Sequence, residues 1–465
     1  MKKCLLLLLL PVSLFAQNDV SAPLQQFIRG QHDYFGFNGN VVVAKEGKVL
    51  YQDALGFASV EPKRMLNNNS VFELASLSDQ FTAMSIMMCK EKGLLGYNDN
   101  LKLFFPQFPY DNITIRNLLT HTSGLPNYED QFKMFWDHGK IAANSDVVDM
   151  LEKRNDSLLF KPGTKYRNSN TGYVLLASIV EKVTGMSFSE FLARNIFKPL
   201  GMTESYCFPA KGPGGKVPPN SALGYVFSDS LKRYLLADSV AGYDYLHYLG
   251  EIVGDRGVKS SAGDLLTWTK ALFGNQLVSN ATLNEMLSPI VPRSPGDTTN
   301  YVGFAYNVQP KSPDGKLISL YGSLPGYRTL MTSLMDKKET IIILSNNEFS
   351  ISFLQAALES ILDGEELIMP YKHIEIKIDT ALLSDYVGKY AAGLTLEFIK
   401  KDGRLFRHRT GTADIELKPE SPTKFFYADG TDRQIEFERD NSGRVSKVWF
   451  INTGQKGEMK KVGPT

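Results

Sequence analysis

Ser76 and Asp79 stand three positions apart at the start of an apolar segment, where a helix would place both on one face. A serine hydroxyl attacks a carbonyl carbon when a neighbouring base takes its proton, and a side chain one turn away can reach it. The helix dipole stabilises an ionised aspartate at this position, so we expect Asp79 to have a low pKa and to be a poor base. The alternative is that both residues simply begin the helix, as their types often do.

Two β-rich hairpins frame the region that must position these side chains. One covers residues 40–52, and the other joins residues 329–335 to residues 339–345. Apolar residues recur at helical spacing between the hairpins, in residues 81–92, 114–120, 172–184 and 262–272. Strands at both ends of a domain with helices between them predict an α+β fold whose two ends share one antiparallel sheet.

The sequence pattern changes after residue 363. Residues 364–376 are mixed and contain Pro370, which predicts a linker between a domain at 17–363 and a second one at 377–465. The second domain alternates short strands with glycine-containing turns, which predicts a small all-β barrel or curved sheet. The predicted strands cover residues 394–400, 404–408, 424–427, 434–439 and 445–451.

Residues 1–16 have the pattern of a secretory signal. Two lysines precede a short apolar run, and Ala16 stands before a polar chain. The run is too short to span a membrane, and no other apolar stretch reaches spanning length. We therefore expect an exported protein, periplasmic or extracellular, without a membrane span.

The net charge and the cysteine and histidine content indicate which partners and cofactors to expect. The formal net charge is +1 over 465 residues, which argues against nucleic acid as the main partner. The three cysteines and six histidines show no metal-ligand spacing, so no metal or other cofactor is expected. Cys89 and Cys207 either pair in an oxidising compartment or are two small buried residues. The sequence leaves the oligomeric state open.

The segment around Ser76 closely resembles the Ser-x-x-Lys nucleophile motif of the serine β-lactamase and penicillin-binding-protein superfamily. Residues 118–126, 197–202 and 257–266 are similar to further signatures of its class C-like branch. The resemblance covers roughly residues 20–360 and implies a β-lactamase/DD-peptidase-like fold, with an antiparallel sheet flanked by helices and a helical lobe. It also implies acyl-enzyme chemistry on Ser76 and a small-molecule, peptide or cell-wall-like ligand.

Three motif positions depart from the family pattern. The lysine is replaced by Asp79, the tyrosine of Tyr-x-Asn by Asn168, and the histidine or lysine of the third motif by Leu320. Asn170 keeps the asparagine of the second motif, and Gly322 keeps the glycine of the third.

Three further residues are candidates for ligand binding. The backbone N–H groups of Ser76 and Ser323 are placed to form an oxyanion hole. Tyr166 matches an aromatic packing position of the family, with a displaced base as the alternative. Arg328 follows the turn after the third motif and either supplies a charge to the site or is simply exposed.

Three changed motif positions predict a large loss of catalytic activity, because the loss of a single base often lowers the reaction rate by several orders of magnitude. The sequence therefore predicts an exported homologue that is catalytically impaired or inactive and has a binding role for peptide or cell-wall-like ligands. The alternative is an active serine hydrolase with a rewired base that is acylated on Ser76. It would be an esterase, a D-amino-acid peptidase or a carboxypeptidase.

Overall fold

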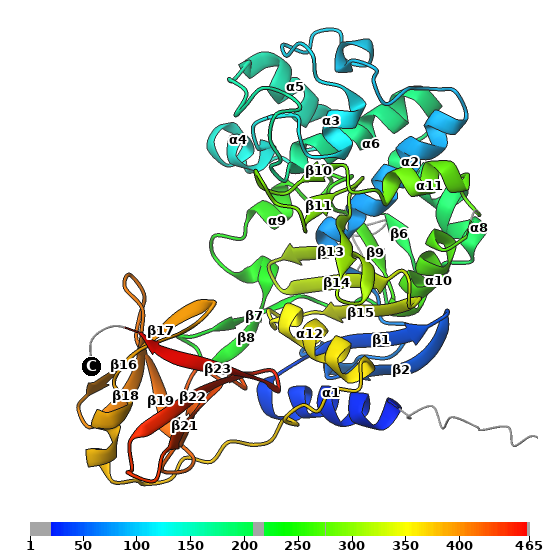
Figure 1. Ribbon diagram of the computed structural model, residues 1–465. Helices are drawn as coiled ribbons and strands as arrows, with labels where there is room; N and C mark the ends of the chain where they lie inside the picture. Colours follow the sequence, from blue (N-terminus) through cyan, green and yellow to red (C-terminus); the bar gives the residue numbers. More distant parts are fainter. Residues whose placement is uncertain (1–19, 208–217, 275, 463–465) are drawn as a thin grey trace, which may run out of the picture.

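The chain folds into an α+β part and a separate β-barrel (Figure 1). The structure is a computed structural model that describes residues 20–207, 218–274 and 276–462. The predicted secretory signal at residues 1–16 lies outside the described residues.

An antiparallel sheet of eight strands organises the first part, in the order β10-β11-β12-β13-β14-β15-β1-β2. Next to its edge strand β2, the sheet pairs β1 (Gly39–Lys45) with β15 (Glu339–Ser345). The two ends of the domain therefore share one sheet, which confirms the prediction from the two hairpins. The other strands are β2 (Lys48–Leu55), β10 (Val291–Pro292), β11 (Tyr301–Val302), β12 (Asn307–Ser312), β13 (Gly315–Leu324) and β14 (Tyr327–Leu334).

Both faces of the sheet are buried, because side chains alternate between two cores along each central strand. Val41 and Ile343 face α1 (Ser21–Phe35) and α12 (Ile351–Leu362). Their neighbours Val42 and Ile342 face the larger core. That core includes buried residues of α2 (Asp79–Glu91), α6 (Asn170–Thr184) and α10 (Ala262–Leu272).

The helical lobe lies on the side of the sheet away from α1 and α12, as Figure 1 shows. The four predicted helical segments correspond to α2, α3 (Ile115–Leu119), α6 and α10. The lobe also contains α4 (Tyr128–Phe135), α5 (Asn144–Arg154) and α7 (Phe188–Leu192), while α9 (Tyr245–Tyr248) and α11 (Asn280–Met286) flank the sheet. No helix among the described residues is long and apolar enough to cross a membrane.

The C-terminal strands close into a barrel of eight antiparallel strands around a core that includes Tyr386, Phe398 and Phe437. The five predicted strands correspond to β17 (Leu394–Lys401), β18 (Arg404–His408), β20 (Lys424–Tyr427), β21 (Gln434–Arg439) and β22 (Val445–Asn452). Three further strands of the barrel were not predicted: β16 (Gly388–Ala392), β19 (Ile415–Pro419) and β23 (Gln455–Val462).

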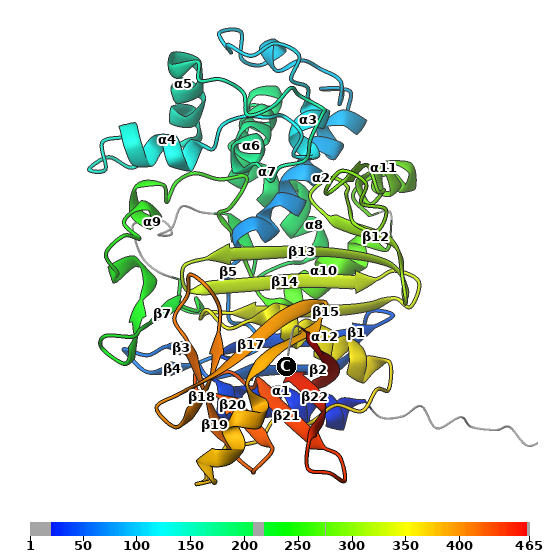
Figure 2. The same ribbon diagram turned by 60° about the vertical axis from the view of Figure 1, so that its left-hand side comes forward.

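The barrel docks beside α1 and α12 in both views (Figures 1 and 2). The Gln31 side-chain amide on α1 donates a buried hydrogen bond of 2.7 Å to the carboxylate of Asp432. Gln455 of the barrel donates to the Ser360 hydroxyl on α12 at 3.1 Å. No regular element occurs between the end of α12 and the short helix at Thr380–Tyr386, so this stretch connects the two parts as extended chain.

Candidate active site

Ser76 lies in a tight turn that joins a short strand to a helix. β5 (Phe72–Glu73) pairs with β9 (Val258–Ser260), a 3-10 turn covers Ala75–Ser78, and α2 begins at Asp79. Ala75 has a φ of 52°, in the left-handed region, which costs a non-glycine residue about 1–3 kcal/mol. The surrounding structure therefore holds the turn against a local preference, as is common at functional sites.

Ser76 lines a cavity of about 460 Å³ together with Asn170 and Ser323. Three of the residues predicted from the motifs thus meet in one pocket, although they are far apart in the sequence. The remaining wall is formed by residues that the motifs do not include: Ala75, Glu129, Asp130, Lys133, His138, Gly242, Asp244, Tyr245, Tyr248, Leu249, Asp255, Arg256 and Leu324.

The start of α6 positions Asn170. Ser169 caps this helix, because its hydroxyl accepts the backbone N–H of Gly172 at 3.2 Å. The backbone N–H of Ser169 itself donates to Nδ1 of His121 at 3.1 Å. Burial lowers the pKa of His121 to about 4, so this imidazole is neutral near pH 7 and serves to hold the helix start.

None of the three departures from the family pattern, Asp79, Asn168 and Leu320, lines the pocket. Leu320 is 6% exposed and packs in the large core, while Asn168 is exposed. Gly322 also does not line the cavity. A Cβ on Gly322 would lie 2.3 Å from the carbonyl oxygen of Leu74, so glycine is needed for β13 to approach the segment that leads to Ser76.

The expectation of a low pKa for Asp79 is wrong. The side chain is 3% exposed, and its Oδ1 has no hydrogen-bond partner among the described residues. Burial raises the pKa of Asp79 well above its usual value, and the nearby carboxyl of Asp255 raises it further against the opposing effect of Arg256. Desolvation therefore outweighs the helix dipole, and the carboxyl favours its protonated form.

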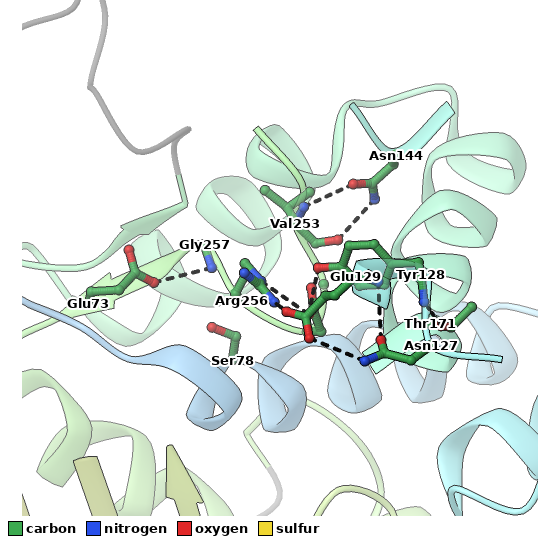
Figure 3. Close-up of polar contacts among 12 residues, drawn as sticks. Glu73, Ser78, Asn127, Tyr128, Glu129, Asn144, Thr171, Val253, Arg256 and Gly257 are labelled. Carbon is green, nitrogen blue, oxygen red and sulfur yellow. Dashed lines mark hydrogen bonds and ion pairs between the residues drawn. The ribbon is translucent and has the colours of Figure 1, made fainter. Parts of the chain in front are cut away.

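Glu129, Asp255 and Arg256 in the pocket wall belong to one ionic cluster. Figure 3 shows Arg256 with Glu129 and Tyr128. The Arg256 guanidinium donates to Glu129 and, at 3.2 Å, to Oδ2 of Asp255. The hydroxyl of Tyr128 donates to the same Oδ2 at 3.0 Å. Burial raises the pKa of Asp255 to about 6 even though Arg256 opposes the shift.

The sequence motifs do not predict this cluster, although one signal for it is present. Asp255 and Arg256 stand between Gly254 and Gly257, directly before the matched segment 257–266, and both glycines have positive φ values of 117° and 92°. A charged pair between two glycines indicates a backbone shaped to turn charged side chains inward. The partner Glu129 could not be found in this way, because 127 positions separate it from Arg256.

Tyr166 and Arg328 do not line the pocket. The ring of Tyr166 lies 6.0 Å from that of His121, and the Arg293 guanidinium lies 5.6 Å from the Tyr166 ring. Arg328 pairs with Glu348 at 2.9 Å and donates to two backbone carbonyls, so its charge is already compensated. These contacts give both side chains a structural explanation.

Cys89 and Cys207 are both buried and free, with pKa values raised by burial to about 11 and about 12. Their thiols are therefore protonated and unreactive near neutral pH. Within the ranges that the structure describes, no group of histidine, cysteine, aspartate and glutamate side chains is arranged to hold a metal ion.

Comparison with known proteins agrees with this geometry. The family model described as Beta-lactamase matches residues 25–366. Penicillin-binding protein 4* of Bacillus subtilis is 40% identical over 398 residues, which are 84% of this chain and 88% of that protein. D-aminopeptidase of Brucella melitensis is 24% identical over 399 residues, which are 85% of this chain and 72% of that protein.

The overall fold also has a counterpart among solved structures. The octameric penicillin-binding protein homologue from Pyrococcus abyssi superposes with a TM-score of 0.66 at 23% identity. The match covers 94% of this chain and 99% of that one, so it includes the barrel as well as the sheet and helices. On the family model and the Bacillus relative together, the chain belongs to the Beta-lactamase family.

Proposed function

We propose that this chain is an exported ligand-binding member of the family in which acylation of Ser76 is strongly impaired. The pocket supports the binding role, because its volume of about 460 Å³ lies in the range typical of small-molecule sites. The name of the Bacillus relative, penicillin-binding protein 4*, supports a peptide or cell-wall-like ligand. The signal-like pattern of residues 1–16 supports export.

One observation carries the proposal. The position three residues after Ser76 holds a buried carboxyl, and no hydrogen bond joins this carboxyl to the Ser76 hydroxyl among the described residues. A base must lie within hydrogen-bond reach of the proton that it takes. Leu320 and Asn168 do not line the pocket, so neither replaces the missing base there.

A second candidate is an active hydrolase in which Asp79 is the base. The raised pKa of Asp79 favours it, because a base works best when its pKa is near the working pH. In this alternative the carboxyl would come within reach of the hydroxyl only when substrate is bound.

Active-site labelling separates the two candidates. The full mature chain is incubated with a fluorophosphonate probe and with a fluorescent penicillin, beside Ser76→Ala and Asp79→Asn. We expect no labelling of the parent protein above the level of Ser76→Ala, and no turnover of nitrophenyl esters. Labelling that disappears in both variants would instead establish the second candidate.

A restored motif tests whether the pocket is otherwise competent. We expect the triple variant Asp79→Lys, Asn168→Tyr, Leu320→His to become acylated by the fluorescent penicillin at a measurable rate, since it regains the three family side chains. The matched control adds Ser76→Ala to the same background and should abolish labelling. A triple variant that folds, as judged by circular dichroism, but does not react would show that the pocket has lost more than these side chains.

A further inference from the structure

Two buried carboxylate oxygens beside the Ser76 pocket lack hydrogen-bond partners. Oδ1 of Asp79 and Oδ1 of Asp255 both have none among the described residues, and the two side chains are 3% and 2% exposed. A buried polar atom without a partner is costly, and native proteins leave few of them. A pair of such atoms next to a cavity indicates that a donor from a ligand completes the site.

The two carboxyls belong to one place in the fold. Asp79 lies one helical turn from Ser76, and Asp255 lines the same cavity as Ser76. The segment that carries Asp255 is hydrogen-bonded to the start of α2 on both sides of Asp79. The Thr82 hydroxyl donates to the Gly254 carbonyl at 2.7 Å, and the Val258 N–H donates to the Ser78 hydroxyl at 3.2 Å.

Arg256 does not pair with the two unpartnered Oδ1 atoms of Asp79 and Asp255. The Arg256 guanidinium is engaged by Glu129 and by the other oxygen of Asp255. The wall of the cavity holds four acidic residues, Glu129, Asp130, Asp244 and Asp255, against Lys133 and Arg256. The wall therefore has an excess of negative charge even when Asp79 is protonated, and this excess attracts a cation.

The geometry points to a ligand with a protonated primary amine, whose ammonium group lies between Asp79 and Asp255, next to Ser76. An ammonium group offers three donors to the unpartnered Oδ1 atoms of Asp79 and Asp255, and the described residues provide no ligand set for a metal ion there. This inference deepens the proposed function, because it names the chemical class of ligand in that pocket. It does not require that Ser76 reacts.

Binding of a small amine tests the inference directly. The full chain is titrated with n-propylammonium chloride, with potassium chloride and 1-propanol as controls for ionic strength and for the alkyl chain. We expect propylammonium alone to raise the thermal unfolding midpoint in a saturable way, and ligand-observed NMR to show its contact with the protein. An equal rise with 1-propanol or potassium chloride, or no saturable rise, would overturn the inference.

Variants locate the site. Asp79→Asn removes a carboxyl that makes no hydrogen bond, so this variant should fold, and we expect its dissociation constant for propylammonium to rise at least tenfold. Asp255→Asn should have the same effect, whereas Asp229→Asn, whose side chain is 92% exposed, should bind like the parent protein. An unchanged dissociation constant for propylammonium in Asp79→Asn would refute the assignment of the amine site to Asp79. The two proposals can fail independently. If Ser76 is labelled by the probes and propylammonium still binds as described, the proposed impairment of Ser76 is wrong and the amine site is supported.

Discussion

At the scale of single residues, Asp79 combines two properties that rarely occur together. It is almost fully buried, and its Oδ1 has no hydrogen-bond partner among the described residues. Its protonated form is favoured because burial and Asp255 both oppose the negative charge. The position that should carry the base for Ser76 thus carries a group that is neutral over a wider pH range than a surface aspartate.

Asp79→Asn should change the pH dependence of stability. A folded-state pKa above the unfolded value of 3.8 means that the folded protein holds this proton more tightly. The contribution is fully present below that unfolded pKa and is lost as the pH rises through the folded pKa. We therefore expect the stability of Asp79→Asn relative to the parent to increase as the pH rises from 4 to 8.

Urea unfolding of the parent and of Asp79→Asn at both pH values measures this effect. Asp264→Asn is an instructive comparison, because burial raises that pKa too, but the Asp264 carboxylate accepts hydrogen bonds from Ser205 and from the backbone of Glu204. That variant should lose stability at pH 8. Parallel pH profiles for the parent and Asp79→Asn would contradict the raised pKa.

Residue types alone identified only part of the site. Ser76, Asn170 and Ser323 could be predicted because the family motifs fix their places, and the structure brings them to one cavity. The shift of the Asp79 pKa could not be predicted, because it depends on how much chain covers the carboxyl after folding. Arg256 was missed for a related reason, since its role depends on a partner from another part of the chain.

At the scale of elements, the contact between β13 and the turn that carries Ser76 sets the shape of the pocket. The Thr329 hydroxyl on β14 donates to the carbonyl of Leu74 at 2.7 Å, and Gly322 on β13 leaves room for that carbonyl. The strand and the turn can approach this closely only because the glycine has no side chain.

Gly322→Ala should therefore open this contact. Its Cβ would meet the Leu74 carbonyl at 2.3 Å and the Thr329 hydroxyl at 2.4 Å, so the backbone must shift. We expect a loss of about 1–3 kcal/mol in the free energy of unfolding, as for other overpacked sites. Gly457→Ala on β23 is the matched control, because its Cβ would meet nothing within 4 Å. Equal stabilities of the two variants, measured by urea unfolding, would refute the argument.

Strands with a clear β-rich sequence pattern were predicted, whereas strands with a weak pattern were not. The strands Thr329–Met335 and Glu339–Ser345 were visible as β-rich runs across a turn, and they correspond to β14 and β15. β23 has the sequence Gln-Lys-Gly-Glu-Met-Lys-Lys-Val, in which Met459 alone is buried. Such a strand is held by its neighbours β22 and β16, so its own sequence carries little of the alternation that identifies strands.

At the scale of the whole molecule, one buried contact ties the barrel to the first part. The Gln31 amide on α1 donates to Asp432, whose pKa is raised by burial. The hydrogen bond joins residues 401 positions apart, so no pattern along the sequence could predict it.

Gln31→Met should loosen the barrel, because it keeps the size of the side chain and leaves the buried Asp432 carboxyl without its α1 donor. We expect a loss of about 1–3 kcal/mol, the usual range for leaving a buried group unsatisfied. Limited proteolysis should then cut faster between residues 363 and 379. Gln26→Met on the exposed side of α1 provides the control. Proteolysis at the same rate in both variants would show that other contacts hold the barrel.

The pairing of β1 with β15 also has a consequence for the order of folding. The Ser345 hydroxyl donates to the backbone carbonyl of Asn38 across 307 positions, so the β1–β15 pair forms only when both distant segments are present. Contacts between distant segments slow folding, because a long loop must be ordered before they form. A ribosome-bound chain that lacks β15 can pair β1 with β2 on one edge only, so the other edge of this apolar strand stays open until residues 339–345 have been synthesised.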